Sequence, residues 1–395
     1  MPGFELFGDE ERRHVQDVLD TGVLFRYGFD AARKGHWKTR SFEQELARRC
    51  GTAHCHLCSS GTAALNIALA ACGVGAGDEV ILPPFTFVAS FESVLQAGAV
   101  PVFSEIDETL CLDPDAIEAR LSPRTKAVIP VHMCGAMARI DEIRDLCRRK
   151  GLLLIEDACQ SVGAVYQGTA LGAFGDMGCF SFDPVKTITC GEGGAVITDR
   201  SELYEKAHAF ADHGHDHIGT DRGAEGHPIL GYNYRISELN AAVGLAQLGK
   251  LDTILSIQRK NKNAIKTALK RHDHLQFRSL PDEEGDSATF LSFMLPDEDH
   301  ARRVNGDLAA AGVDGCFYYY DNNWHYLRRW HHLKQMQVAA RLAVQDADHF
   351  PDFEHVVLPR SDAIMARTIS MQIKLSWTEE DIEQRIAKMN TVFGG

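Results

Sequence analysis

Between residues 60 and 200, short apolar runs alternate with helical segments, and this alternation restricts the possible folds more than any other feature. The apolar runs predict strands over 79–84, 100–106, 127–132 and 152–158, and the intervening segments predict helices over 61–71, 87–98, 113–121 and 140–151. The strand-like runs are continuous rather than alternating in polarity, which is typical of strands buried on both faces. We therefore expect an α/β fold with a mostly parallel central sheet flanked by helices.

Ligands bind at the carboxyl ends of the strands in such folds. Those ends carry Pro83, Pro84 and Phe85, then His132, then Asp157. From about residue 250 the pattern changes, because 251–271 predicts a long charged amphipathic helix while 290–295 and 312–320 predict further strands. We expect a large domain over 1–250 and a smaller C-terminal α+β domain over 251–395.

Composition and charge exclude several classes of protein. The formal net charge of -14 argues against nucleic-acid binding. The stretch 50–77 has no Asp, Glu, Lys or Arg, but polar residues such as His54 and His56 interrupt it, so we expect a buried helix entered from a polar loop rather than a membrane span. Cys55 and Cys58 form one Cys-x-x-Cys pair with no second pair at zinc-site spacing, which favours buried thiols. The first residues lack the order of a secretory signal, which predicts a cytoplasmic protein.

Three segments carry residues suited to chemistry. Lys186 lies among small, hydroxylated and glycine residues in 181–198, where a partly desolvated amine can attack a carbonyl; an ordinary loop lysine is the alternative. Asp157 ends a predicted buried strand and needs a cationic partner there, or else it caps the next loop. The segment 59–62 (Ser-Ser-Gly-Thr) precedes a helix and suits a phosphate, although a plain N-cap fits as well.

Taken together, these segments resemble the pyridoxal 5'-phosphate (PLP) enzymes of fold type I. More narrowly, the chain resembles the sugar aminotransferases of the DegT/DnrJ/EryC1/StrS family. The resemblance spans essentially the whole chain and includes PPFTFVAS at 83–90, KAVIPVHMCG at 126–135 and GYNYRISELNAA at 231–242. Several such motifs in the order of the family are far more specific than any one of them.

Carried over residue by residue, the resemblance implies that Lys186 holds PLP and later moves the α-proton of the substrate. It implies that Asp157 pairs with the pyridine nitrogen and keeps it protonated. Further cofactor contacts implied by the resemblance are Ser60, Gly61, Thr62 and Ser181 at the phosphate, Phe87 on the ring face and Gln160 near the ring oxygen. Asn233 would reach the phosphate of a neighbouring subunit, which implies a homodimer with shared active sites.

Two regions depart from the commonest pattern of the family. The N-terminal loop 23–42 is long and basic, and it suggests an anion near the mouth of the active site, with a solvated basic loop as the alternative. The C-terminal part replaces a proline-rich segment of relatives with polar and aromatic residues, which could equally be core or dimer-interface residues. The candidate substrate-binding residues in these regions are Arg26, Tyr27, Lys38, Tyr320, His325 and Lys374.

Within the family, FRYGFD, HWKTR, ADHGHDHIG and SDAIMARTISMQIKLSW resemble one subgroup, the transaminases that form 8-amino-3,8-dideoxy-manno-octulosonate (8-amino-Kdo), an amino form of the lipopolysaccharide sugar Kdo. This resemblance implies glutamate as the amino donor and a free sugar acid with an aldehyde at C8 as the acceptor. We expect Arg26, Lys38 or Lys374 to bind the sugar carboxylate. Because donor and acceptor use one site in turn, we also expect ping-pong kinetics.

Other interpretations remain open at this point. His213, His215 and His217 alternate along the chain in a way that permits metal binding, but the family has no metal there, and we expect a loop near the active site. Within the fold, the acceptor could be a nucleotide-linked keto-sugar. A sugar dehydratase is disfavoured because such relatives carry histidine where this chain has Lys186. From a different class, the protein could be a non-catalytic PLP-binding sensor or scaffold.

Overall fold

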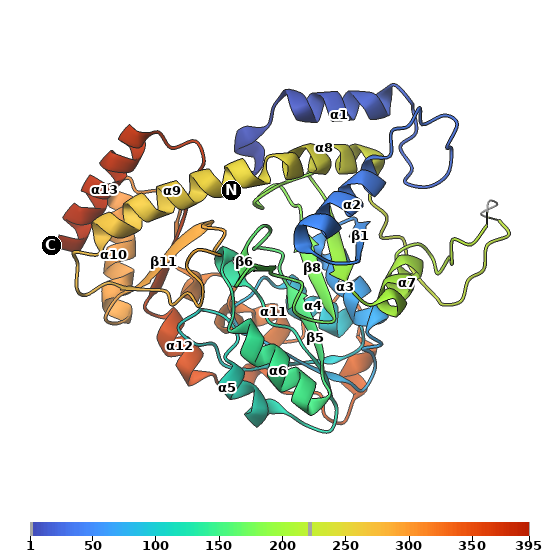
Figure 1. Ribbon diagram of the computed structural model, residues 1–395. Helices are drawn as coiled ribbons and strands as arrows, with labels where there is room; N and C mark the ends of the chain where they lie inside the picture. Colours follow the sequence, from blue (N-terminus) through green and yellow to red (C-terminus); the bar gives the residue numbers. More distant parts are fainter. Residues whose placement is uncertain (1–2, 220–222, 395) are drawn as a thin grey trace.

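The computed structural model describes residues 3–219 and 223–394. Its central feature is a seven-stranded sheet in the order β1-β9-β8-β5-β4-β2-β3 (Figure 1). The strands are β1 (His54–Cys58), β2 (Glu79–Leu82), β3 (Val100–Phe103), β4 (Thr125–Val128), β5 (Leu153–Asp157), β8 (Met177–Ser181) and β9 (Gly194–Thr198). Strands β8, β5, β4, β2 and β3 pair in parallel, whereas β9 is antiparallel to both neighbours. The predicted mostly parallel sheet is confirmed.

Helices cover both faces of this sheet, which explains why most residues of its strands are apolar. One face packs on α3 (Gly61–Ala71), α4 (Ala89–Gln96) and α7 (Ser201–Phe210). The other face packs on α6 (Ile140–Lys150), α2 (Lys38–Cys50) and α8 (Glu238–Gly249), with α1 (Asp9–Leu19) outside α8. Successive residues of one strand enter opposite layers, since Val80 and Leu82 face the α3 side while Ile81 faces the α6 side. The result is a three-layer sandwich.

A second, antiparallel sheet lies in the C-terminal part of the chain. Its order is β10-β11-β13-β12, and it is covered by α9 (Leu251–Leu269), α10 (Glu298–Ala310) and α13 (Glu379–Gly394). Its strands are β10 (Gln276–Phe277), β11 (Phe290–Met294), β12 (Cys316–Phe317) and β13 (Thr368–Gln372). The segment 327–358 leaves this sheet and packs on the large one, where Trp330 is fully buried against Phe91 of α4. The C-terminal residues thus contribute to both cores.

Short elements complete the chain. They are α5 (Pro114–Ile117), α11 (His331–Lys334), α12 (Pro359–Met365) and the small hairpin β6 (Val165–Tyr166) and β7 (Thr169–Ala170). None of the described helices is both long enough and apolar enough to cross a membrane.

Two local predictions are wrong. His54–Cys58 was expected in a loop, yet it forms β1, because its residues pair in full register with Gly194–Thr198 of β9. The strand expected over 312–320 is limited to the two residues of β12, because the chain then turns through a 3-10 helix at Tyr319–Asp321. Cys55 and Cys58 are buried free thiols, as predicted.

Candidate active site

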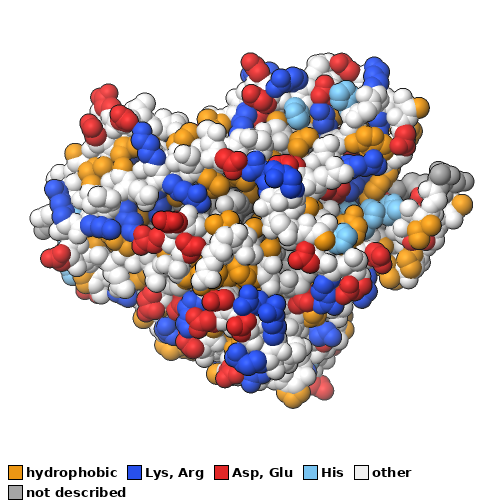
Figure 2. Space-filling model, in the orientation of Figure 1, with side chains coloured by type: hydrophobic (Ala, Val, Ile, Leu, Met, Phe, Trp, Pro, Cys, Tyr) orange, Lys and Arg blue, Asp and Glu red, His pale blue; other side chains and the backbone are white. Residues whose placement is uncertain are grey.

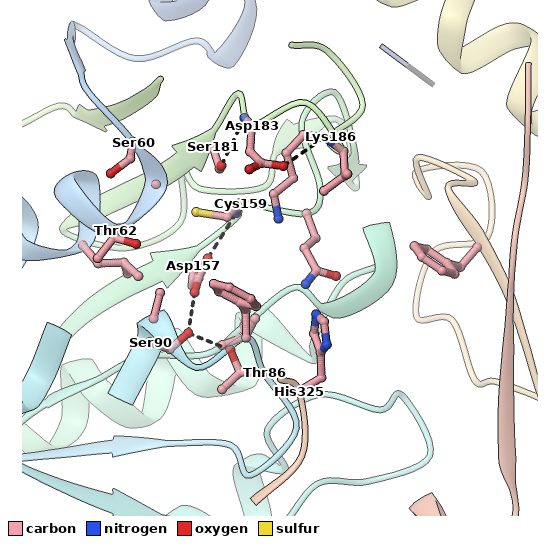
Figure 3. A pocket seen from close by; sticks show the side chains of 18 of the residues that line it. Ser60, Thr62, Thr86, Ser90, Asp157, Cys159, Ser181, Asp183, Lys186 and His325 are labelled. Atoms are coloured by element: carbon pink, nitrogen blue, oxygen red, sulfur yellow. Dashed lines mark hydrogen bonds between the residues drawn. The ribbon is translucent and has the colours of Figure 1, made fainter. Parts of the chain in front are cut away.

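A cavity of about 440 Å³ opens at the carboxyl edge of the central sheet. It lies where β5 and β8 end, where α3 begins and where the chain leaves β2 (Figure 3). The predicted site residues that line it are Ser60, Gly61, Thr62, Phe87, Asp157, Gln160, Ser181, Lys186 and His325. Sequence segments that lie more than a hundred residues apart therefore meet in one cavity.

Asp157 is the last residue of β5 and is only 4% exposed. Its Oδ2 accepts a hydrogen bond from Ser90 Oγ at 2.8 Å, and its Oδ1 accepts one from the backbone N of Cys159 at 3.2 Å. Among the described residues, none forms an ion pair with it. A buried carboxylate is costly without a counter-charge, so this position suits a cationic group of a ligand.

The N-terminus of α3 faces the same cavity. Ser60 caps the helix by accepting a hydrogen bond from the backbone N of Ala63 at 3.0 Å. A Cβ at Gly61 would lie 2.7 Å from Ser181 Cβ, so a glycine is needed for α3 to approach β8 this closely. The first N–H groups of the helix, its dipole and the hydroxyls of Thr62 and Ser181 are groups suited to a phosphate.

Lys186 lies in the loop between β8 and β9, and its side chain reaches into the cavity (Figure 3). Its backbone is held from two directions: the N–H of Lys186 donates to Asp183 O at 3.0 Å, and the N–H of Gly3 donates to Lys186 O at 3.3 Å. The described cavity lining contains this one Lys or Arg side chain, with the carboxylates of Asp157, Asp183 and Glu192. The lysine amine therefore enters an acidic pocket.

One wall of the cavity is made by two chain segments that pair with each other. The ring of Phe87 stacks on Trp324 with centroids 5.6 Å apart, and the N–H of Thr86 donates to His325 O at 3.0 Å. His325 Nδ1 lies 3.0 Å from Asn322 Oδ1. Burial and the nearby Lys186 charge lower the pKa of His325 to about 4, so its imidazole is neutral at pH 7.

Several lining residues escaped sequence analysis. They are Thr86, Ser90, Cys159, Asp183, Glu192, Phe290, Phe317, Tyr319 and Gln372, among others. Thr86 and Ser90 flank Phe87 within PPFTFVAS, so that motif was the available signal for them. Tyr319 and Gln372 come from the C-terminal part, and nothing in their local sequence indicates which cavity they face.

The expected basic loop 23–42 is a loop only up to its last five residues, because α2 begins at Lys38. Its charges do not reach this cavity within one chain. Arg26 is buried, where Nη2 donates to Glu43 Oε1 and Nη1 donates to Leu57 O, both at 2.6 Å. Lys38 is also buried and pairs with Asp17 at 2.6 Å. These groups hold the loop against the protein because buried charges need partners. The expectation that they line the cavity mouth is therefore corrected for the single chain.

Other predicted residues also lie outside the Lys186 cavity. Tyr320 is buried with Arg328 4.2 Å from its ring centroid, and Lys374 forms an ion pair with Asp314. Asn233 is exposed on the long connection between α7 and α8. Its proposed contact with a second subunit stays a prediction.

The histidine-rich loop forms a ring stack. His217 stacks on Tyr27 with centroids 4.5 Å apart and on His208 at 4.1 Å. Tyr27, Arg26 and His217 line a second cavity of about 670 Å³ rather than the one that holds Lys186. Within 3–219 and 223–394, no three His, Cys, Asp or Glu side chains are arranged to hold a metal ion, His213 and His215 included.

Comparison with known proteins identifies the family. The sequence profile of the DegT/DnrJ/EryC1/StrS aminotransferase family matches residues 7–390. The chain belongs to this family. Its enzymes use PLP, and one solved structure with 25% identity and a TM-score of 0.79, the Bacillus subtilis protein ntdA, holds the PMP form of the cofactor and covers 100% of this chain and 84% of that one.

Relatives with assigned reactions match part of the chain. A GDP-perosamine synthase of Caulobacter vibrioides is 43% identical over 251 residues, which is 63% of this chain and 64% of that protein. An L-glutamine:2-deoxy-scyllo-inosose aminotransferase of Streptomyces kanamyceticus is 41% identical over 267 residues, covering 63% and 62%. The match thus spans less than two thirds of the length of these curated relatives. An aminotransferase structure from Psychrobacter cryohalolentis superimposes with a TM-score of 0.83 at 28% identity, covering 98% of this chain and 97% of that one.

The lining residues fit PLP by their chemistry. Asp157 supplies a buried carboxylate for a protonated ring nitrogen, and Gly61 and Thr62 bring the N-terminus of α3 to the cavity wall, where a phosphate can accept from helix N–H groups. Gln160 is fixed by its Oε1, which accepts from the backbone N of Cys134 at 2.9 Å. The cavity thus offers groups for each polar part of the cofactor.

Proposed function

We propose that this protein is a PLP-dependent aminotransferase that moves the amino group of glutamate to a sugar carbonyl. The observation that carries the proposal is the meeting of three features in one cavity: the Lys186 amine, the buried Asp157 carboxylate and the N-terminus of α3. These match an aldehyde, a pyridine nitrogen and a phosphate respectively. When bound, PLP supplies an electron-accepting ring for the carbon that loses a proton.

Four residues of this chain have distinct proposed roles toward the cofactor and the substrate. With PLP bound, Lys186 would hold the cofactor covalently and would move the proton at the substrate α-carbon. Asp157 keeps a proton on the ring nitrogen because a buried carboxylate favours a neighbouring positive charge. Phe87, stacked on Trp324, supplies a flat wall that sets the plane of the ring. The neutral His325 adds no second positive charge beside Lys186.

For the amino acceptor we propose the C8 aldehyde of an oxidised Kdo, which would give 8-amino-Kdo for lipopolysaccharide in the cytoplasm. The support is the resemblance of four segments, among them 211–219 and 361–377, to the subgroup that makes this sugar. A nucleotide-linked keto-sugar is the second candidate, favoured by the similarity to a GDP-perosamine synthase. Glutamine is the donor named for another relative, so both amino acids belong in the assay.

A homodimer with shared active sites is part of the proposal. The described cavity lining of one chain holds three carboxylates and one lysine, which is unfavourable for a phosphate and a dicarboxylic donor, so further cations must come from outside it. The segment 211–236 carries Asn233 and exposes apolar side chains, with Ile218 at 76% and Leu230 at 93%. Figure 2 displays histidine and apolar side chains together on the lobe beside α7. A second copy that covers this segment would bury them.

The function is tested by the visible absorption of the purified holoprotein. Glutamate should remove the band of the lysine-bound cofactor, and the C8-aldehyde sugar acid should restore it. The band should be missing in Lys186→Ala and present in Lys206→Ala, an exposed lysine on α7 that serves as the matched control. Restoration by a nucleotide keto-sugar alone would replace the acceptor and keep the reaction. A wild-type protein with bound PLP that ignores both amino donors would refute the reaction and favour a sensor or scaffold.

The shared site is tested by mixing two inactive variants. Lys186→Ala and Asn233→Ala would each be inactive as homodimers. After joint refolding, mixed dimers should regain activity, because one of the two sites then has both an intact Lys186 and an intact partner Asn233. No recovery in mixed dimers of verified composition would mean that each chain builds its own site.

A further inference from the structure

A short chain of hydroxyl groups stands behind Asp157. Ser90 Oγ lies 2.8 Å from Asp157 Oδ2, and Thr86 Oγ1 lies 2.6 Å from Ser90 Oγ (Figure 3). Ser90 is 1% exposed and Thr86 is fully buried. Buried hydroxyls have few other partners, so these contacts account for most of their hydrogen bonding.

The direction of these hydrogen bonds follows from the groups involved. An ionised carboxylate only accepts, so the single Ser90 proton points at Asp157. The Ser90 oxygen is then free to accept, and the Thr86 hydroxyl donates to it. Each donation strengthens the next, and the net effect stabilises negative charge on Asp157. The backbone N–H of Cys159 donates to Oδ1 of Asp157, so each carboxylate oxygen accepts a hydrogen bond from the protein.

The same segment also fixes the ring-stacking wall. Thr86, Phe87 and Ser90 lie within five residues, from the turn after β2 into the first turn of α4. The backbone of Thr86 is tied to His325, and the ring of Phe87 is stacked on Trp324. The orientation of the ring plane and the orientation of Asp157 therefore depend on one rigid piece of chain.

We propose that Ser90, supported by Thr86, is a positioning residue that holds the Asp157 carboxylate directed at the ring nitrogen of PLP. This inference rests on the proposed role of Asp157 toward the cofactor. Ser90 does not need to touch PLP for this effect, because it acts through the carboxylate. Its contribution should therefore appear only with a cofactor that has a ring nitrogen.

The test compares the binding of two cofactors to apoprotein: PLP and its 1-deaza analogue, in which carbon replaces the ring nitrogen. Ser90→Ala should weaken PLP binding by about tenfold to a hundredfold, the range for a hydrogen bond to a charged group, and should weaken binding of the analogue by less than about threefold. Thr86→Val keeps the shape of the side chain and removes only the outer hydroxyl, so it should weaken PLP binding by about threefold. Thr86→Val also tests the proposal if Ser90→Ala folds poorly.

Ser93→Ala is the matched control. Ser93 lies on the same helix, is fully buried and does not line the cavity, and its Oγ has no hydrogen-bond partner within 3–219 and 223–394. Its loss should leave both affinities within about twofold of wild type. Equal weakening of both cofactors by Ser90→Ala would indicate a purely structural role and overturn the inference, as would unchanged PLP affinity. A wild-type apoprotein that binds neither cofactor would instead overturn the proposed function.

Discussion

We expect the stability of the protein to depend strongly on the buried carboxylate of Glu156, the neighbour of Asp157 on β5. Glu156 is fully buried, and each of its oxygens accepts two hydrogen bonds. Oε1 accepts from the backbone N of Phe174 at 2.6 Å and of Gly175 at 2.8 Å. Oε2 accepts from the backbone N of Gly172 at 2.8 Å and lies 2.9 Å from His132 Nε2.

His132 cannot move its proton to suit a different side chain at position 156. His132 Nδ1 accepts from the backbone N of Ala138 at 3.3 Å, so its proton must be on Nε2, where it points at Glu156. In Glu156→Gln, an amide NH₂ replaces one oxygen and meets two N–H donors whichever way it turns. Two hydrogen bonds to a charged group are lost, at about 1.5–3 kcal/mol each, which gives a destabilisation of about 3–6 kcal/mol.

The assay is urea unfolding of the apoprotein, followed by circular dichroism. Glu354→Gln, at an exposed position, is the control and should change the free energy of unfolding by less than about 0.5 kcal/mol. Glu156→Gln should lower it by at least about 3 kcal/mol. A loss below about 1 kcal/mol in Glu156→Gln would refute the reasoning, because it would mean that the four donors find other partners.

Three further predictions concern buried groups. Arg26→Met should destabilise the protein by about 3 kcal/mol in the same urea assay, because Glu43 loses its cation; a selective rise in the KM for a sugar acid without this loss would restore Arg26 as a substrate ligand. Burial lowers the pKa of His208 to about 3, so below pH 6.5 the unfolded chain takes up a proton that the folded chain does not. His208 alone should therefore contribute a fall in stability of about 2 kcal/mol from pH 7.5 to 5, and His208→Gln should reduce the pH dependence by that amount, whereas an unchanged slope would contradict it. Gly61→Ala should weaken PLP binding by at least about tenfold, because its Cβ would meet Ser181 at 2.7 Å; fluorescence titration of the apoprotein with PLP measures this, and wild-type affinity would count against a phosphate site at α3.

Sequence reasoning located the central sheet and much of the cavity for a physical reason. Strands buried on both faces are largely apolar, and the residues at their carboxyl ends must lie at one edge, so Asp157 could be placed at the ligand-binding edge. Ser181 came only from the resemblance to the family, and the structure places it at the end of β8, the parallel neighbour of β5. The edge strand β1 was missed because it contains two histidines and pairs with β9, about 140 residues away. Pairing with a strand that is distant in the chain cannot be recognised from the local sequence.

Charged side chains were the least predictable part. Arg26 and Lys38 belong to a loop that looks solvated, yet both turn inward to partners such as Glu43 and Asp17. A cluster of positive charges in the sequence indicates only that anions are near, and these anions can equally be carboxylates of the protein. Ser90 escaped notice for a related reason, since its acceptor lies 67 residues away on β5.

The contact between Gly3 and the Lys186 loop links regions that are distant in sequence. A Cβ at Gly3 would lie 2.9 Å from the backbone N of Thr189, so the first residues fit tightly on this loop. Two residues further on, Glu5 Oε2 accepts from the backbone N of Ser376, beyond β13. A displacement of the C-terminal sheet would thus be passed through residues 3–5 to the backbone of the lysine.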